Sequence, residues 1–402
     1  MVPVSRAITQ PRMDGVVSPA AEGAPSRYTE GQVPAERESV PLCSGTRNTR
    51  HRAGTNSPRM PPSPDEQRPP LYLIGVPGRV GGASTKLFHL IRLLQRDYQI
   101  TLVAPDIAVL KDKEVRRCLE PYRIPCTLLK DLPKQLDGVA LAICDKDFFV
   151  SGRAREIKAR GLKVVWSNEM MWPFKGEAEA VKEGLIDRVL FVSEFQAKVF
   201  EEMYRGVPSF LTGNYVDPDD YCWRERTHPT FTLGRLSRVD PAKYPLNFPV
   251  FYEELGLLDV RYRIMAWSPE VQKQYRWHQF GPEWELLPAN KEPGLKFLYS
   301  LDLFVYPLGH RVKESWGRAV VEAMLTGAVP LVPAGHQFER LLVHGESGFI
   351  CEAYRQWKET VRELYENYLY RQQISRQGAA YAREQLCNAE EHRKLWIEAL
   401  SF

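Results

Sequence analysis

From residue 71 onward, short apolar runs alternate with amphipathic segments, and this alternation constrains the fold more than any other feature of the chain. An apolar run at 71–75 leads into a glycine-rich turn, helically spaced apolar residues at 84–96 and a second apolar run at 98–104. Strand, glycine turn, helix and strand in this order predict a βαβ unit. Such crossovers connect parallel strands, so the chain is expected to fold around parallel sheets.

The alternation continues over most of the chain, in two series. Further strands are expected at 139–144, 162–166, 188–192, 230–233, 262–266, 303–306 and 329–332, and helices at 153–160, 194–204, 316–326 and 355–385. Turn-forming residues cluster at 217–229, between the two series. The pattern therefore predicts two α/β domains joined by a linker.

The first seventy residues differ from the rest. They are rich in Pro, Arg, Ser, Gly and Glu and have no apolar periodicity. Such a segment cannot bury enough apolar surface to offset its chain entropy, so we expect 1–70 to be a disordered tail. It lacks the apolar core of a secretory signal. A misassigned start, with Met60 as the first residue, is an equal alternative for this segment.

Bulk composition narrows the class of protein. A chain of 402 residues has room for two domains, and a net charge of +4 is too small to indicate a nucleic-acid partner. No apolar run reaches the roughly 18–20 residues of a membrane span, although a peripheral membrane contact stays open. The seven cysteines are scattered and form no C-x-x-C pair, which favours reduced thiols in a cytoplasmic protein over disulfides or a zinc site.

One stretch, residues 314–330, combines two carboxylates with the start of a helix. Glu314 lies in a loop, and Glu322 lies eight positions later in the helix that follows. Both can face one ligand above the helix N-terminus, where unpaired N–H groups and the helix dipole favour a diphosphate. Gly317 allows the ligand close to the backbone, and Gly327 is expected to end the helix. Spacing alone also fits an exposed helix with two solvated glutamates.

This stretch resembles the signature of glycosyltransferase family 4, in which two glutamates are separated by seven residues. The matching positions are Glu314, Trp316, Gly317, Glu322, Ala323, Met324, Gly327 and Pro330. The resemblance implies that Glu314 lies beside the donor sugar and that Glu322 binds the ribose hydroxyls, for which carboxylates are strong acceptors. Ser315 and Arg318 replace a glycine and an apolar residue beside this site, changes that could alter which sugar is accepted.

Other segments resemble the same family, and the resemblance covers about residues 71–385. Residues 233–243 resemble its G-R-L…K segment, which implies that Arg235 and Lys243 hold the diphosphate and offset charge on the leaving group. Their spacing is longer than usual, and a surface cation is the alternative for either. Gly81 and Gly82 resemble the glycine pair of the family's first turn, which faces donor and acceptor.

On the acceptor side the chain departs from the family. Many members have a T-x-H segment after the strand that here ends at Trp166, and the matching residues are Ser167, Asn168 and Glu169. Glu169 would then take the place of the histidine, where it could receive a proton or hold the acceptor. A loop glutamate with no catalytic role is the alternative.

The resemblance implies the GT-B fold: two facing Rossmann-like domains, 71–225 for the acceptor and 226–385 for the donor, with a cleft between them and a helix at 386–402 crossing back to the first. It further implies a retaining glycosyltransferase that moves a sugar from a UDP or GDP sugar to an unidentified hydroxyl. Neither cofactor nor metal is expected. The pair Asp145 and Asp147 is interpreted as a charged loop rather than a metal motif.

Three alternatives stay open. The glycines at 75, 78, 81 and 82, with Asp106 after the second strand, suggest a nicotinamide dehydrogenase, but their order breaks the G-x-G-x-x-G fingerprint. The second alternative is a nucleotide-sugar epimerase or a phosphorylase with the same fold. A catalytically inactive binding protein would also explain the unusual acceptor side.

Overall fold

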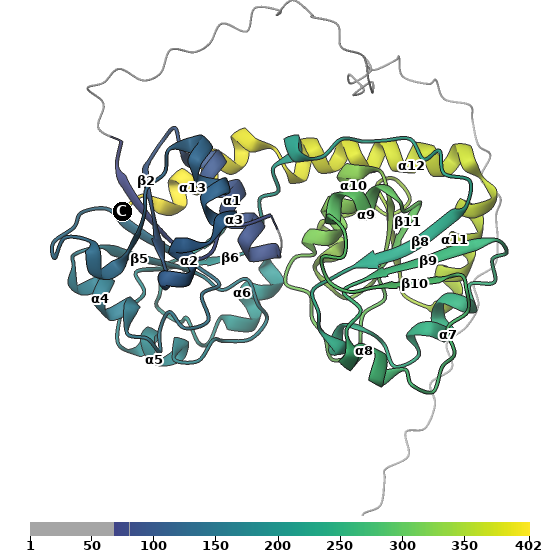
Figure 1. The fold of residues 1–402 in the computed structure, drawn as a ribbon, viewed down its shortest axis with the longest axis horizontal. Coiled ribbons are helices and arrows are strands. Elements are labelled where there is room, and N and C mark those ends of the chain that lie inside the picture. Colours follow the sequence, from purple (N-terminus) through teal and green to yellow (C-terminus); the bar gives the residue numbers. More distant parts are fainter. Residues whose placement is uncertain (1–67, 80) are drawn as a thin grey trace, which may run out of the picture. The chain divides into compact units, whose positions relative to one another are not determined.

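Two parallel sheets, of seven and six strands, make up the described part of the chain (Figure 1). The computed structural model describes residues 68–79 and 81–402. The expected disordered tail therefore lies outside the described residues, except for its last three positions. Of these, Pro70 already belongs to the first strand.

The first sheet has the strand order β3-β2-β1-β4-β5-β6-β7. Its strands are β1 (Pro70–Ile74), β2 (Gln99–Ala104), β3 (Cys126–Leu128), β4 (Val139–Ile143), β5 (Lys163–Ser167), β6 (Arg188–Phe191) and β7 (Ser209–Leu211). The order reverses between β1 and β4. Ligands of such open sheets bind beyond the carboxyl ends of the strands at this reversal.

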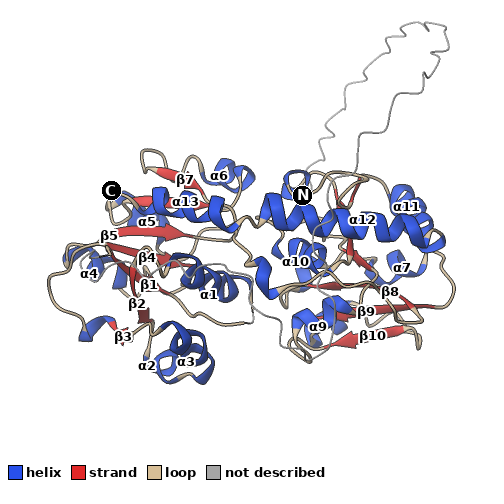
Figure 2. Cartoon of the chain, turned by 90° about the horizontal axis from the view of Figure 1, so that it is seen from above, coloured by secondary structure: helices blue, strands red, loops and turns tan. Residues whose placement is uncertain are grey.

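Helices cover both faces of this sheet (Figure 2). They are α1 (Gly82–Leu94), α2 (Ile107–Lys111), α3 (Lys113–Leu119), α4 (Arg153–Ala159), α5 (Glu177–Lys182), α6 (Glu194–Phe200) and, from the end of the chain, α13 (Ala389–Leu400). Within β4, Leu141 shares a core cluster with Leu90 of α1, whereas Ala140 shares another with Ile157 of α4. Because both faces are buried, the strand is apolar throughout.

The second sheet has the order β10-β9-β8-β11-β12-β13, which reverses between β8 and β11. Its strands are β8 (Phe231–Leu236), β9 (Val260–Met265), β10 (Trp284–Leu287), β11 (Leu303–Val305), β12 (Val329–Pro333) and β13 (Phe349–Cys351). Its helices are α7 (Phe248–Glu253), α8 (Pro269–Gln274), α9 (Gly294–Tyr299), α10 (Arg318–Thr326), α11 (Tyr354–Glu366) and α12 (Tyr368–Tyr381). The predicted two α/β series are thus present.

Two sequence-based expectations need correction. The expected single helix at 355–385 is wrong: α11 ends before Asn367, whose side chain accepts the Tyr370 N–H at 3.0 Å and caps α12. An asparagine that competes for backbone hydrogen bonds favours such a break. The edge strands β3, β7, β10 and β13 were not predicted, because three or four residues are too few to show a period.

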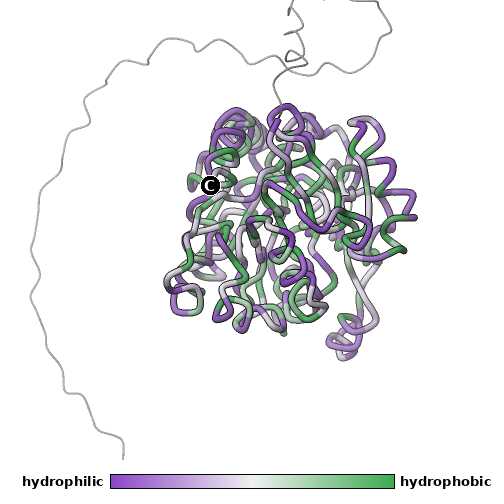
Figure 3. The backbone as a smooth tube through the Cα atoms, turned by 90° about the vertical axis from the view of Figure 1, so that its left-hand side faces the viewer, coloured by the Kyte–Doolittle hydropathy of each residue, from purple (hydrophilic) through white to green (hydrophobic). Residues whose placement is uncertain are grey.

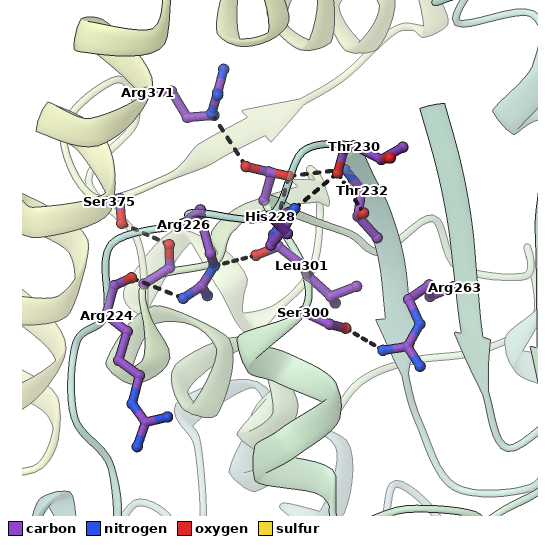
Figure 4. Close-up of polar contacts among 12 residues, drawn as sticks. Arg224, Arg226, His228, Thr230, Thr232, Arg263, Ser300, Leu301, Arg371 and Ser375 are labelled. Atoms are coloured by element: carbon purple, nitrogen blue, oxygen red, sulfur yellow. Dashed lines mark hydrogen bonds and ion pairs between the residues drawn. The ribbon is translucent and has the colours of Figure 1, made fainter. Parts of the chain in front are cut away.

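The segment that connects the two sheets is fastened to the second one by buried polar groups (Figure 4). Arg226 donates to the carbonyls of Leu301 at 2.6 Å and Thr326 at 2.9 Å. Asp302 accepts from the backbone of Thr232 at 2.9 Å and lies 3.6 Å from Arg371. Burial lowers the pKa of Arg226 to about 10, although Asp302 opposes the shift.

After α12 the chain returns to the first sheet. Trp396 of α13 is fully buried in the same core cluster as Leu90 of α1. Arg393 forms an ion pair with Asp97, and Arg188 donates to the carbonyl of Ala399 at 2.8 Å. All described residues belong to one compact unit, and the domain boundaries expected from the sequence stay predictions.

Hydrophobic residues lie mainly in the interior, while hydrophilic residues gather at the outer turns (Figure 3). None of the helices in the described ranges combines the length and the apolar character that a bilayer crossing requires.

Candidate functional site

Lys243 and Glu314, two of the residues predicted at the donor site, meet beyond the carboxyl ends of β8 and β11. The strand order reverses between these two strands. Glu314 follows β11, and its Oε2 accepts from the Lys243 Nζ at 2.8 Å. The Tyr306 hydroxyl lies 3.2 Å from both groups, accepting from Lys243 and donating to Glu314. An ion pair is therefore built where this fold is expected to bind a ligand.

Burial and charge oppose each other in this pair. Burial would raise the pKa of Glu314, but the Lys243 ammonium and its hydrogen bond outweigh it and hold that pKa below the ordinary value. Burial would likewise lower the pKa of Lys243, whereas Tyr306 and Glu314 raise it above its ordinary value. Both shifts favour the charged forms, so the pair is ionised near neutral pH.

Arg235, expected at the diphosphate, is fully buried in the structure. Its guanidinium lies 4.4 Å from the ring centroids of both Tyr244 and Tyr306 and donates to the Pro307 carbonyl at 2.7 Å. The guanidinium is thus enclosed by aromatic rings in this structure. These contacts fit a supporting role beside Tyr306, and phosphate binding by Arg235 stays a prediction.

Arg238 was missed by the sequence reasoning. It stands only five positions before Lys243, and the long Arg235–Lys243 spacing was the signal that could have revealed it. Its guanidinium is partly exposed, lies 4.7 Å from the Trp172 ring centroid and donates to the Met170 Sδ at 3.3 Å. Burial raises the pKa of Glu314, and the Arg238 charge helps to lower it, after the larger effects of Lys243 and Tyr306.

Helix α10 begins at this ion pair. Gly317 precedes the helix with φ 106°, and a Cβ there would lie 2.7 Å from the Phe338 ring, which explains the glycine. Trp316 is buried in the core. Ser315 donates through its hydroxyl to the backbone carbonyl of Glu169 at 2.9 Å, and thus joins the two sheets.

Glu322 lies on the first turns of α10, and its side chain is 16% exposed. Arg318 donates to its Oε1 from Nε at 2.9 Å. Burial and, after it, the charge of the Glu322 carboxylate raise the pKa of the nearby Tyr221 hydroxyl. Because an ionised carboxylate can accept about four hydrogen bonds, Glu322 keeps acceptor capacity for a ligand.

Glu169, on the side of the first sheet, is held by several donors. Its Oε1 accepts from Lys86 Nζ and Ser167 Oγ, each at 2.5 Å, and its Oε2 accepts from Asn214 at 3.3 Å. The backbone of Glu169 has φ 68°, which is uncommon for a residue with a side chain. Burial lowers the pKa of Lys86, although Glu169 opposes the shift.

Asn168 supports the loop rather than facing a ligand. Its amide donates to both carboxylate oxygens of Glu177, at 3.0 and 2.9 Å, and its Oδ1 accepts from the backbone of Met170 at 2.8 Å. Glu177 is fully buried and also accepts from Trp166 at 2.7 Å. This cluster fixes the turn on which Glu169 is carried.

The remaining predicted positions have local explanations. Gly81 precedes α1 with φ 86°, and a Cβ on Gly82 would lie 3.7 Å from Arg318, so the first turn borders α10. Asp106 accepts two backbone N–H groups of α2, at 2.8 and 2.9 Å, which weakens the dehydrogenase alternative. Asp145 forms an ion pair with Arg153, in keeping with a charged loop.

Residues 269–381, which include Glu314, Glu322 and all of α10, match the family model described as "Glycosyl transferases group 1". The part of the chain that carries the predicted donor site is therefore similar to group 1 glycosyltransferases. No curated protein matches it by sequence.

Solved structures place the chain in the GT-B fold. HepE of Anabaena, solved with UDP and glucose, superposes with a TM-score of 0.64 at 16% identity, covering 83% of this chain and 99% of that chain. Sucrose-phosphate synthase of Thermosynechococcus elongatus gives a TM-score of 0.62 at 11% identity, over 82% and 98%. A glycosyltransferase of Rickettsia africae gives 0.63 at 10% identity, over 83% and 99%.

Proposed function

We propose that this chain is a glycosyltransferase that moves a sugar from a nucleoside-diphosphate sugar to an acceptor hydroxyl, with retention of configuration and without a divalent metal. One observation carries the proposal: the Glu314–Lys243 ion pair lies directly before the start of α10, and Glu322 lies within the first turns of that helix. The first group suits a sugar diphosphate, and the second suits the ribose hydroxyls.

Positive charge for the leaving group comes from the protein in this proposal. Lys243 and Arg238 supply two cations, and the backbone N–H groups at the start of α10 supply a third positive region. Such fixed charges stabilise negative charge as it develops on the departing diphosphate. In this proposal Arg238 has the phosphate-binding role that the sequence assigned to Arg235, because Arg235 is buried between two tyrosine rings.

In the proposed step, the bond between the anomeric carbon and the phosphate oxygen breaks. The acceptor oxygen bonds to that carbon from the same face, and its proton passes to the departing phosphate oxygen. Glu169 already accepts three hydrogen bonds from the protein, so we assign it to holding the acceptor side rather than to taking the proton.

A uridine nucleotide is proposed as the donor, because HepE was solved with UDP and with UDP-glucose on the same fold. The test is the thermal stability of the purified chain in EDTA with UDP, GDP, ADP or CDP. At roughly 100 times its dissociation constant, a ligand adds about 2.7 kcal/mol, which raises Tm by several degrees. We expect the shift with UDP and its loss in Glu322→Ala.

Glu359→Ala, which removes an exposed glutamate of α11, is the matched control and should keep the shift. A shift with GDP alone would replace the donor base and leave the site intact. The absence of any shift at millimolar nucleotide would refute the proposed function. Anomeric NMR signals of the product test retention, and activity that needs added Mg²⁺ after EDTA would refute metal independence.

A further inference from the structure

Arg318, the first residue of α10, uses all three nitrogens of its guanidinium in hydrogen bonds. Nε donates to the Glu322 Oε1 at 2.9 Å. Nη1 donates to the Asn214 side-chain oxygen and to the Tyr215 carbonyl, both at 2.9 Å, and Nη2 lies 2.9 Å from the His89 Nδ1. The residue is only 8% exposed. A buried guanidinium with partners in every direction has one orientation, in contrast to a surface ion pair.

The imidazole of His89 is kept neutral by its surroundings. Its Nδ1 accepts from the backbone N–H of Asp217 at 2.8 Å as well as from Arg318, so the ring proton must lie on Nε2, which faces Asp220 at 3.0 Å. Burial lowers the pKa of His89 to about 4, and the Arg318 charge adds to this shift while Asp220 opposes it. Arg318 therefore meets an acceptor here at neutral pH.

Glu322 accepts from the Nε of Arg318, and the Tyr221 hydroxyl lies near its carboxylate. The hydrogen bond from Arg318 restricts the orientation of the carboxylate. Its remaining lone pairs are directed away from these partners. The guanidinium thus links this carboxylate to α1 and to residues 214–215 of the first sheet's side.

We propose that Arg318 is a positioning residue, which acts through Glu322 by presenting its carboxylate to the ribose of the donor nucleotide. This rests on the proposed function, in which Glu322 accepts from the ribose hydroxyls. Four of the five N–H groups of Arg318 already donate to protein partners, so at most one is left for a direct contact with the ligand. Its removal should weaken the ribose contact and leave the contacts to the diphosphate unchanged.

The test is a double-mutant cycle on nucleotide affinity, measured by calorimetry with UDP and with 2′,3′-dideoxy-UDP. Arg318→Leu and Glu322→Gln should each weaken UDP binding by about tenfold, the size expected for a lost charge-assisted contact. In the Glu322→Gln background, Arg318→Leu should have little further effect, because coupled residues are not additive. Neither variant should change the affinity for the dideoxy nucleotide.

Equal weakening of UDP and dideoxy-UDP by Arg318→Leu would overturn the proposal in favour of a phosphate contact. Additive effects in the cycle would overturn it in favour of a general structural role. Arg318→Lys, which keeps the charge, is the variant to use if Arg318→Leu does not fold, and it should retain part of the affinity. Arg340→Leu removes an exposed arginine, 2.9 Å from Glu194, and should bind UDP normally. If the wild type binds another nucleoside diphosphate but not UDP, the cycle is measured with that nucleotide and its 2′,3′-dideoxy analogue; failure to bind any of the four would instead refute the proposed function.

Discussion

Single side chains in this protein often have a role different from the one their spacing indicates. Arg235 and Arg238 are three positions apart, yet one is enclosed by two tyrosine rings and the other is partly exposed beside Glu314. A guanidinium enclosed by rings retains cation–π attraction but loses access to a ligand. The type of a side chain limits the chemistry that it can perform. Its burial decides whether a ligand can reach it.

The Glu314–Lys243 pair leads to a prediction about pH. The native pKa of Glu314 lies below its ordinary value, so its contribution to stability is complete above that value and is lost as the pH falls through the native pKa. Glu314→Gln leaves Lys243 without its carboxylate and should cost about 2–3 kcal/mol at pH 7. The Tm difference between wild type and variant should shrink between pH 5 and pH 3.

Scanning calorimetry of both proteins across this range measures the effect. Glu359→Gln, on the exposed face of α11, serves as the control and should not alter Tm at any of these pH values. A difference that stays constant from pH 7 to pH 3 would contradict the assigned ion pair.

His89 gives a second prediction, with its own pH window. Its native pKa of about 4 lies below the ordinary value of 6.5, so the unfolded state binds more protons between these values. Native stability should therefore fall as the pH drops from 6.5 to 4, by about 3 kcal/mol at roughly 1.4 kcal/mol per unit. Arg318, Arg92, Asp217 and Asp220 all face the ring or its partners.

Urea unfolding of wild type and His89→Gln at pH 7 and pH 4.5 isolates this contribution. The variant lacks the imidazole, while the neighbouring carboxylates titrate in both proteins. At pH 7 the free energy of unfolding of the wild type should exceed that of the variant, and most of this difference should be lost at pH 4.5. If the difference in the free energy of unfolding between wild type and variant grows on acidification, His89 is protonated in the native state.

At the scale of elements, α10 is defined by its two ends. Gly317 and Gly327 both adopt positive φ, 106° and 92°, and bound the helix between the Glu314 loop and β12. The nearest atoms to a Cβ on Gly317 belong to Phe338, at 2.7 Å, and to Leu341. The start of α10 therefore depends on close packing as well as on backbone freedom.

Gly317→Ala should destabilise the protein by about 3 kcal/mol or more, because left-handed strain of about 1–2 kcal/mol adds to overpacking against Phe338. Gly335→Ala is the matched control: it has φ 77°, but nothing lies within 4 Å of its Cβ position. The destabilisation caused by Gly335→Ala should reflect the left-handed backbone strain alone. Urea unfolding measures both, and equal costs would mean that the contact with Phe338 does not constrain the loop.

At the scale of the whole molecule, the end of the chain completes the core of its beginning. Trp396 of α13 is fully buried among residues of α1, β1 and β4, and the Lys86 Nζ lies 5.2 Å from its ring centroid. Lys86 in turn pairs with Glu169. The last helix is therefore part of the support for the candidate acceptor side.

Trp396→Ala should cost about 3–5 kcal/mol, the usual range for removing a buried aromatic side chain. Hydrogen exchange should speed up in α1 more than in α10, because α13 contacts α1. Leu369→Ala, at a position 77% exposed, should change stability by less than about 0.5 kcal/mol. Equal acceleration in α1 and α10 would contradict local support by α13.

The sequence by itself determined the alternation of strands and helices, the glycine boundaries of α10 and the carboxylates around it. These features depend on neighbours a few positions apart, since helical and strand periods and turn preferences are local properties of the chain. The long runs at β1, β4 and α1 were predicted for this reason, whereas the three- and four-residue edge strands carry no period.

Only the tertiary structure decided which side chains meet. Lys86 reaches Glu169 across 83 positions, and Arg318 reaches His89 across 229. Strand order brings such residues together, and no local pattern records it. Burial is likewise a property of the packed molecule, so Arg235 could be separated from Arg238, and Asn168 assigned to Glu177, only when the neighbouring elements were in place.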